Sequence, residues 1–122
     1  NIPVASSVIH LGVIGKSAGA QVQLALYTDV GNQPGTLVVS TAAHTLTPGV
    51  NELPVQTTAV PAGQYWIMGV YDAGWSIGFD LGTLSAVVRY RTHTFGTLLP
   101  NEFGDNQTYT GQRFNYYVKV AQ

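Results

Sequence analysis

The sequence predicts an all-β domain folded as a two-sheet antiparallel β-sandwich of the jelly-roll kind. No segment keeps a helical period, because apolar residues either alternate with polar ones or run in short blocks. Gly, Pro, Asn and Asp interrupt these blocks about every ten residues, which is typical of short strands joined by turns. The chain has 122 residues and shows neither an internal repeat nor a linker, so we expect a single domain over 1–122.

The first half of the chain is expected to hold a series of strands over 4–14, 21–28, 36–41 and 50–56, with 42–47 continuing or re-entering the sheet. The segment 21–28 alternates cleanly, with Val22, Leu24 and Leu26 facing the core. We expect a loop over 29–35, where Pro34 ends the pairing. Pro54 inside the next strand indicates a sheet edge, because proline cannot donate to a ladder.

The segment 65–71 carries apolar residues on both faces. Strands without a polar face are usually central in a sheet and covered on both sides, so we expect this strand in the middle of the sandwich. A small-residue loop follows it at 72–75, then strands over 76–80, 86–95 and 112–120, with an irregular segment over 96–108.

Charge and composition restrict the partner. Only 9% of the residues are charged and the formal net charge is −1. Nucleic acid would need a basic stripe and an anionic membrane surface a basic cluster, so neither is expected. Many Thr, Asn, Gln, Gly and Tyr residues favour neutral polar partners, of which sugars are the obvious class. Many extracellular β-domains share this composition without binding anything.

The chain contains no cysteine, which excludes a thiol enzyme, a thiolate metal site and a redox motif. No apolar run reaches the roughly 18 residues that a membrane helix needs, so we expect no membrane insertion. The sequence starts at Asn1 without an initiator methionine or a signal peptide. An excised module or a processed secreted chain would look like this, and we expect an extracellular location.

The loop tip after the apolar strand is the first candidate for ligand contact. Trp75 lies there between Gly74 and Ser76, with Asp72 and Tyr71 just before it. A flat, rigid aromatic ring is a natural platform for the apolar face of a pyranose. The alternative is that Trp75 folds back over an open end of the core.

Two further aromatic residues are candidate platforms. Trp66 lies in the middle of the apolar strand and points with Met68, so core packing competes with sugar contact. Tyr117 points with Asn115 and Lys119 on a polar face, which favours the surface. We therefore count Tyr117 as a second platform.

Arg89, Arg91 and His93 line one face of one expected strand at i, i+2 and i+4. Such donors could form the floor of a groove and bind sugar hydroxyls. The alternative is an exposed face with local ion pairs to Asp72 or Asp80, each worth little.

Neither a metal centre nor a catalytic centre is indicated. The three histidines share no ligand spacing, and no calcium-loop consensus is present. A glycosidase needs two carboxylates flanking the scissile bond, and no acid pair stands in a recognisable context. No Gly-x-Ser-x-Gly elbow exists either, so we expect no enzyme.

The order of local segments resembles β-sandwich modules appended to secreted and surface proteins of bacteria. The resemblance rests on Leu-Ala-Leu-Tyr-Thr-Asp at 24–29, Gly-Asn-Gln-Pro-Gly-Thr-Leu at 31–37, Leu-Thr-Pro-Gly-Val-Asn-Glu-Leu-Pro at 46–54, and Pro-Ala-Gly-Gln-Tyr-Trp-Ile at 61–67. Within that group the chain looks most like a carbohydrate-binding module of a soil-bacterial cellulase.

This resemblance implies non-catalytic binding of β-glucan (cellulose chains, cello-oligosaccharides, mixed-linkage glucan or xyloglucan) in an open groove, which would hold an attached glycoside hydrolase near its substrate. It requires no cofactor but leaves room for a structural Ca²⁺, whose ligands the sequence does not identify. The site residues come from the residue patterns and not from a family motif. The alternative function is adhesion or assembly on a bacterial surface protein, since such modules occur there too.

Overall fold

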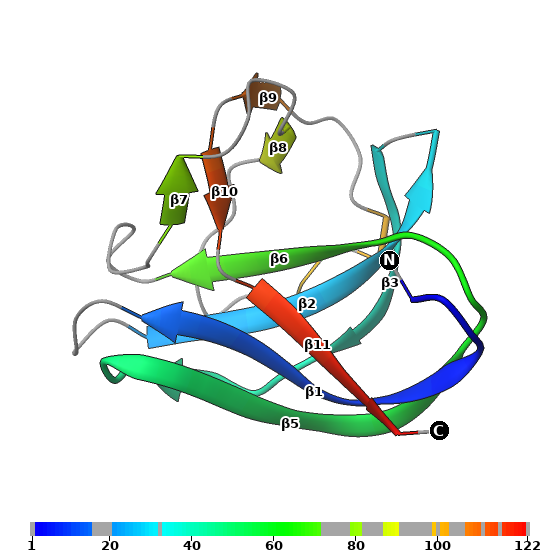
Figure 1. The fold of residues 1–122 in the computed structure, drawn as a ribbon, viewed down its shortest axis with the longest axis horizontal. Helices are drawn as coiled ribbons and strands as arrows, with labels where there is room; N and C mark the ends of the chain where they lie inside the picture. The colour runs from blue at the N-terminus through cyan, green and yellow to red at the C-terminus, as the bar shows by residue number, and fades with distance from the viewer. Residues whose placement is uncertain are drawn as a thin grey trace.

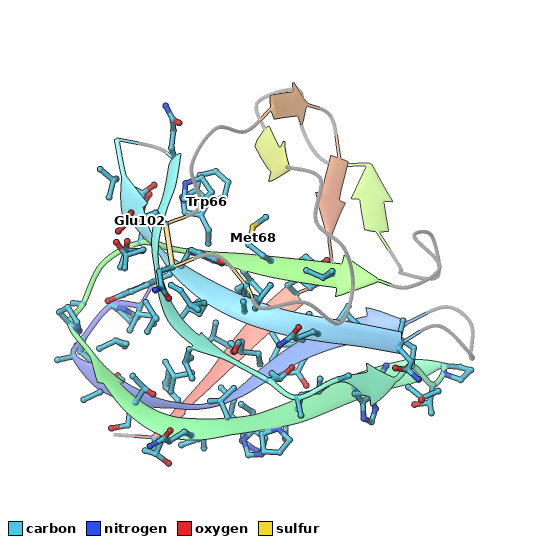
Figure 2. All side chains as sticks on the ribbon, turned by 180° about the vertical axis from the view of Figure 1, so that it is seen from behind. Trp66, Met68 and Glu102 are labelled. Carbon is cyan, nitrogen blue, oxygen red and sulfur yellow. The ribbon has the colours of Figure 1, made fainter. Side chains whose placement is uncertain are left out.

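The computed structural model describes residues 2–15, 21–31, 33–71, 79–81, 87–90, 99, 101–102, 107–110, 112–114 and 116–121. Over this part of the chain the fold is all-β, with eleven strands. Two antiparallel sheets, one of three and one of four strands, pack face to face, so the predicted β-sandwich is confirmed. Figure 1 looks onto the three-stranded sheet, and Figure 2 shows the molecule from behind.

The three-stranded sheet has β1 (Ser6–Gly15) in its centre, between β11 (Tyr116–Ala121) and β5 (Gly49–Val60). Both pairings are antiparallel and shift register between Val8 and His10, which marks a β-bulge in β1. In the described part of the chain β5 is an edge strand, as Pro54 predicted.

The four-stranded sheet is built on β2 (Gln21–Val30). One edge of β2 pairs with β3 (Gln33–Ser40) and with the short β4 (His44–Thr45), and the other edge pairs with β6 (Tyr65–Tyr71). Two small antiparallel pairs lie beyond β6 in Figure 1. They are β7 (Phe79–Leu81) with β10 (Gln112–Phe114), and β8 (Val87–Tyr90) with β9 (Gln107–Thr110).

The core lies between the two large sheets and is formed mainly by the central strand of each. Every second residue of β2 is fully buried at Val22, Leu24 and Leu26, as the alternation predicted. The facing side chains of β1 are Val8, Leu11 and Val13. Burying an aliphatic side chain of this size contributes about 1.5–3 kcal/mol, so this double row is the main source of cohesion between the sheets.

The prediction that 65–71 is the central strand is wrong for the described residues, where β6 pairs with β2 alone and β2 holds the centre. Both faces of β6 are apolar because one face of the four-stranded sheet packs on the core and the other carries a second apolar cluster. Tyr65 and Ile67 face the core, whereas Trp66 and Met68 join a second apolar cluster on the outer face.

The prediction of a loop over 29–35 is also wrong. Val30 pairs with Gln33, so β2 and β3 form a hairpin with a two-residue connection. Gly31 has a φ of 59°, which this tight turn requires and which glycine adopts without strain. Pro34 lies within β3 opposite Asp29, because proline is tolerated near the start of an edge strand.

Asn51 is a buried polar residue that fixes the turn leading into β5. Its exposed fraction is 2%. Its side-chain amide donates to the carbonyl oxygens of Thr47 at 2.8 Å and Gly49 at 3.0 Å, and its Oδ1 accepts from the Thr47 amide at 2.9 Å. Because the Asn51 side chain both donates to and accepts from these backbone groups, neither Asp nor Leu, which are of similar size, would satisfy them.

We expect Asn51→Leu to lower the free energy of unfolding by about 1–3 kcal/mol, because it leaves the Thr47 amide and two carbonyls without partners. Urea denaturation measures this loss. The matched control is Gln56→Ala on the exposed face of the same strand, which should change stability by less than about 0.5 kcal/mol. Equal effects of the two substitutions would contradict the role assigned to Asn51.

Candidate functional site

Most of the predicted sugar contacts lie beyond what the structure describes. Trp75, Asp72, Arg91 and His93 are outside the described residues. Tyr71 and Arg89 are placed by their backbone alone, Tyr71 opposite Val22 at the end of β6 and Arg89 opposite Thr108 in the β8–β9 pair. The aromatic sugar platform predicted at Trp75 therefore stays a prediction.

Trp66 lies half-buried on the outer face of the four-stranded sheet. Its ring and Met68 pack against Ala25 and Tyr27 of β2. Figure 2 shows both labelled side chains on the side of β6 where β7 to β10 lie. The indole Nε1 donates to Asp29 Oδ1 at 2.7 Å, which fixes the ring. The sequence left packing open as the alternative to sugar contact, and the surroundings of Trp66 are those of a packed side chain.

Leu99 packs on the same outer face, and Asn101 and Glu102 pair with the edge of β3. The Leu37 amide donates to the Asn101 carbonyl at 2.7 Å, and Thr36 Oγ1 lies 3.1 Å from Glu102 Oε1. Leu99 packs on the cluster that contains Trp66. Asn101 and Glu102 thus extend the sheet at the β3 edge, while Leu99 covers part of its outer face.

Tyr117 lies on the opposite side of the sandwich, on the outer face of the three-stranded sheet. Gly12 is its direct neighbour on β1, and Glu52 is the neighbour of Gly12 on β5. The phenol oxygen donates to Glu52 Oε1 at 3.2 Å, so the side chain reaches across β1 from one outer strand to the other. Trp66 and Tyr117 therefore cannot line one groove.

Gly12 makes room for the Tyr117 ring. A Cβ atom at position 12 would lie only 2.1 Å from the Tyr117 Cζ. No real pair of carbon atoms approaches so closely, so any larger residue would push the ring off the sheet. Glycine inside a strand normally weakens it, and here it marks the close approach of an aromatic ring.

Lys119 completes the polar surroundings of the ring. Its Nζ lies 3.3 Å from Glu52 Oε2, with exposed side-chain fractions of 51% for Lys119 and 34% for Glu52. An ion pair this exposed adds little stability, but it cancels the two charges on this face. His10 is the cross-strand neighbour of both Lys119 and Pro54, and its Nδ1 is buried without a hydrogen bond to any described residue.

These contacts change two acid–base equilibria. Desolvation acts to raise the pKa of the Glu52 carboxyl, but the hydrogen bonds from Lys119 and Tyr117 and the charge of Lys119 outweigh it, so the pKa lies below its ordinary value. For Tyr117, desolvation and then the hydrogen bond to the Glu52 carboxylate and its charge raise the pKa of the phenol.

We call this surface the outer strip. It comprises the outward-facing residues of three cross-strand rows, namely Ile14 and Val50, then Gly12 with Tyr117 and Glu52, then His10 with Lys119 and Pro54. Sequence reasoning found Tyr117 through the alternation of the last strand. It missed Gly12, Glu52 and His10, for which a glycine inside an apolar strand was the one visible signal.

The strip offers an aromatic ring beside one carboxylate, one ammonium group and one imidazole. Such a set can hold polar, uncharged molecules through ring contact and hydrogen bonds. No three His, Cys, Asp or Glu side chains come together as a metal-binding group among the described residues. Within the same residues there is no helix long and apolar enough to cross a membrane.

Comparison with known proteins adds no relative. No family model, no curated protein and no solved structure matches this chain.

The lowered pKa of Glu52 predicts how the carboxyl titrates. Because the folded-state pKa lies below the ordinary value of 4.5, the contacts of Glu52 are fully present above that value and are lost as the pH falls through the lowered one. An NMR titration of the side-chain carboxyl carbon measures its midpoint.

We expect that midpoint to move upward in Lys119→Met, which removes both a donor and a positive charge, and to a smaller extent in Tyr117→Phe, which removes one donor. An unchanged midpoint in both variants would show that Glu52 does not engage these partners in solution.

Proposed function

We propose that this domain is a non-catalytic binding module that holds a neutral polysaccharide of the β-glucan class on its open sheet face. The supporting observation is the Tyr117 side chain, which lies across Gly12 with its hydroxyl on Glu52. The face around it lies on the outside of the sandwich, and the polar side chains of Glu52 and Lys119 adjoin the ring.

The chemistry of the outer strip fits a sugar chain. A pyranose presents apolar C–H groups on its ring faces and hydroxyl groups around its rim. The half-exposed Tyr117 ring can pack on the C–H groups, and its fixed position lowers the entropy lost on binding. Glu52 can accept hydrogen bonds from the sugar hydroxyl groups, and Lys119 can donate hydrogen bonds to them. Because these two side chains neutralise each other, the strip favours an uncharged polysaccharide over an anionic one.

Trp75, Tyr71, Asp72, Arg89, Arg91 and His93 remain proposed sugar contacts. Trp66 is assigned to packing on the opposite face, where it shares an apolar cluster with Leu99 and donates to Asp29. The module would act outside the cell, where it keeps an attached glycoside hydrolase on its substrate. This part of the proposal rests on the resemblance to cellulase modules.

Adhesion or assembly is the second candidate function. Ile14 and Val50 lie opposite each other on β1 and β5, with exposed fractions of 40% and 65%. They stand beside the β5 edge, which is unpaired among the described residues. Exposed apolar side chains next to a free edge favour pairing with another protein. Sedimentation at two concentrations, with a dimer and no response on a glycan array, would favour this function.

The role of Tyr117 is tested by titration calorimetry with cellohexaose. We expect Tyr117→Ala to weaken binding by about 1–3 kcal/mol, as the loss of an aromatic anchor does at other interfaces. Tyr117→Phe keeps the ring and should bind nearly as well as the wild type. Gly12→Ala should also weaken binding, because the added methyl group displaces the ring.

Trp66→Phe is the matched control, since it alters an aromatic residue on the opposite face. Equal affinity of Tyr117→Ala and the wild type would reject the assignment of the ring. Absence of binding to cellohexaose, mixed-linkage glucan and xyloglucan by the wild-type domain would reject the function itself.

A further inference from the structure

A shallow, open depression of about 490 Å³ lies at the end of the three-stranded sheet. It is formed where β1 begins and where β5 and β11 end, close to the C-terminus in Figure 1. Its lining consists of small or apolar residues, namely Ala5, Ser6, Ser7, Ala59, Val60, Pro61 and Ala121. None of these residues was singled out by the sequence patterns.

Strand register places part of the lining of this depression, the row of Ser7, Ala59 and Ala121, on the same face as the outer strip, whereas Ser6 and Val60 in the adjacent row face the core. Ser7 lies opposite Ala121 on one side and Ala59 on the other, which makes one row across all three strands. The next residue, Val8, faces the core with an exposed fraction of 0%. Since side chains alternate between the two faces of a strand, the row of Ser7 points outward, as Lys119 does after its inward neighbour Val120.

The surface is hollow at this row because its side chains are small. In the neighbouring rows the side chains of Lys119 and Tyr117 cover the backbone, whereas two alanines and a serine leave it open. The hydroxyl of Ser7 makes no hydrogen bond with the described part of the chain, unlike that of Ser6, which donates to the Val4 carbonyl at 2.9 Å. The depression thus combines apolar walls with the Ser7 hydroxyl group.

We propose that this depression is a second sugar subsite and that the ligand is a linear oligosaccharide long enough to contact it and Tyr117 together. The inference rests on the proposed function of the outer strip. On β11, Ala121 opposite Ser7 and Tyr117 opposite Gly12 are four positions apart, which is roughly 13 Å along a strand. A sugar ring can pack on the alanine side chains and exchange a hydrogen bond with Ser7, while the chain continues over His10 and Lys119 to the Tyr117 ring.

The physical consequence is a dependence of affinity on chain length. A short oligosaccharide that occupies the Tyr117 position gains nothing from the depression. A longer one gains both contacts but loses little additional rotational and translational freedom, since one molecule makes them. The strip therefore selects internal stretches of a polysaccharide over its short fragments.

The test fills the depression and compares two ligands. Ala59→Gln and Ala121→Gln place a longer side chain at exposed positions of the row, so folding is not at risk. The matched control is Ala43→Gln, which adds the same side chain at an exposed position between β3 and β4 on the other sheet. Calorimetry with cellotriose and with cellohexaose is run on the wild type and on each variant.

We expect the wild type and Ala43→Gln to bind cellohexaose at least about tenfold more tightly than cellotriose, a ratio that corresponds to about 1.4 kcal/mol. In Ala59→Gln and Ala121→Gln the cellohexaose affinity should fall to the cellotriose level, with cellotriose binding unchanged. If both filled variants bind cellohexaose like the control, the second subsite is refuted and the Tyr117 site stands. If the wild type binds neither sugar, the proposed function and the subsite are refuted together.

Discussion

The contact between β1 and β2 is the interaction on which the rest of the structure depends. Each is the central strand of its sheet, and each buries a row of aliphatic side chains against the other sheet, interrupted in β1 by the β-bulge between Val8 and His10. The outer strands add to this pair by antiparallel ladders and complete the core with single residues such as Leu53 and Val60. Weakening the β1–β2 contact would therefore release both sheets together.

The two outer faces of the sandwich have different environments. Behind β2, a second apolar cluster that includes Leu99 covers part of the sheet, and the Trp66 indole donates to Asp29. On the other side, the described residues leave the rows of β11, β1 and β5 open, and Tyr117 lies across them. A ligand that needs an accessible aromatic ring is better served by the open face, although tryptophan is the larger platform.

Several elements follow from the sequence alone. Alternation predicted the inward side of β2, and it placed Tyr117 with Lys119 on a surface of the last strand. Pro54 predicted an edge because a proline, which lacks the backbone N–H, cannot donate a hydrogen bond to a neighbouring strand. The same logic failed for Pro34, since position near the start of a strand decides whether proline is tolerated. It failed for 65–71, because an apolar strand is compatible both with a central place and with an edge covered on its outer face.

The sequence by itself determined the all-β class, the approximate strand boundaries and the inward-facing residues of the well-patterned strands, because backbone alternation is a local property. Only the tertiary structure decided which residues share a row. Tyr117 and Glu52 are 65 residues apart, and their contact depends on the registers of two separate ladders and on the absence of a side chain at Gly12. The candidate site is formed by such cross-strand contacts. The pairing of segments that are distant in the sequence depends on how the whole core packs.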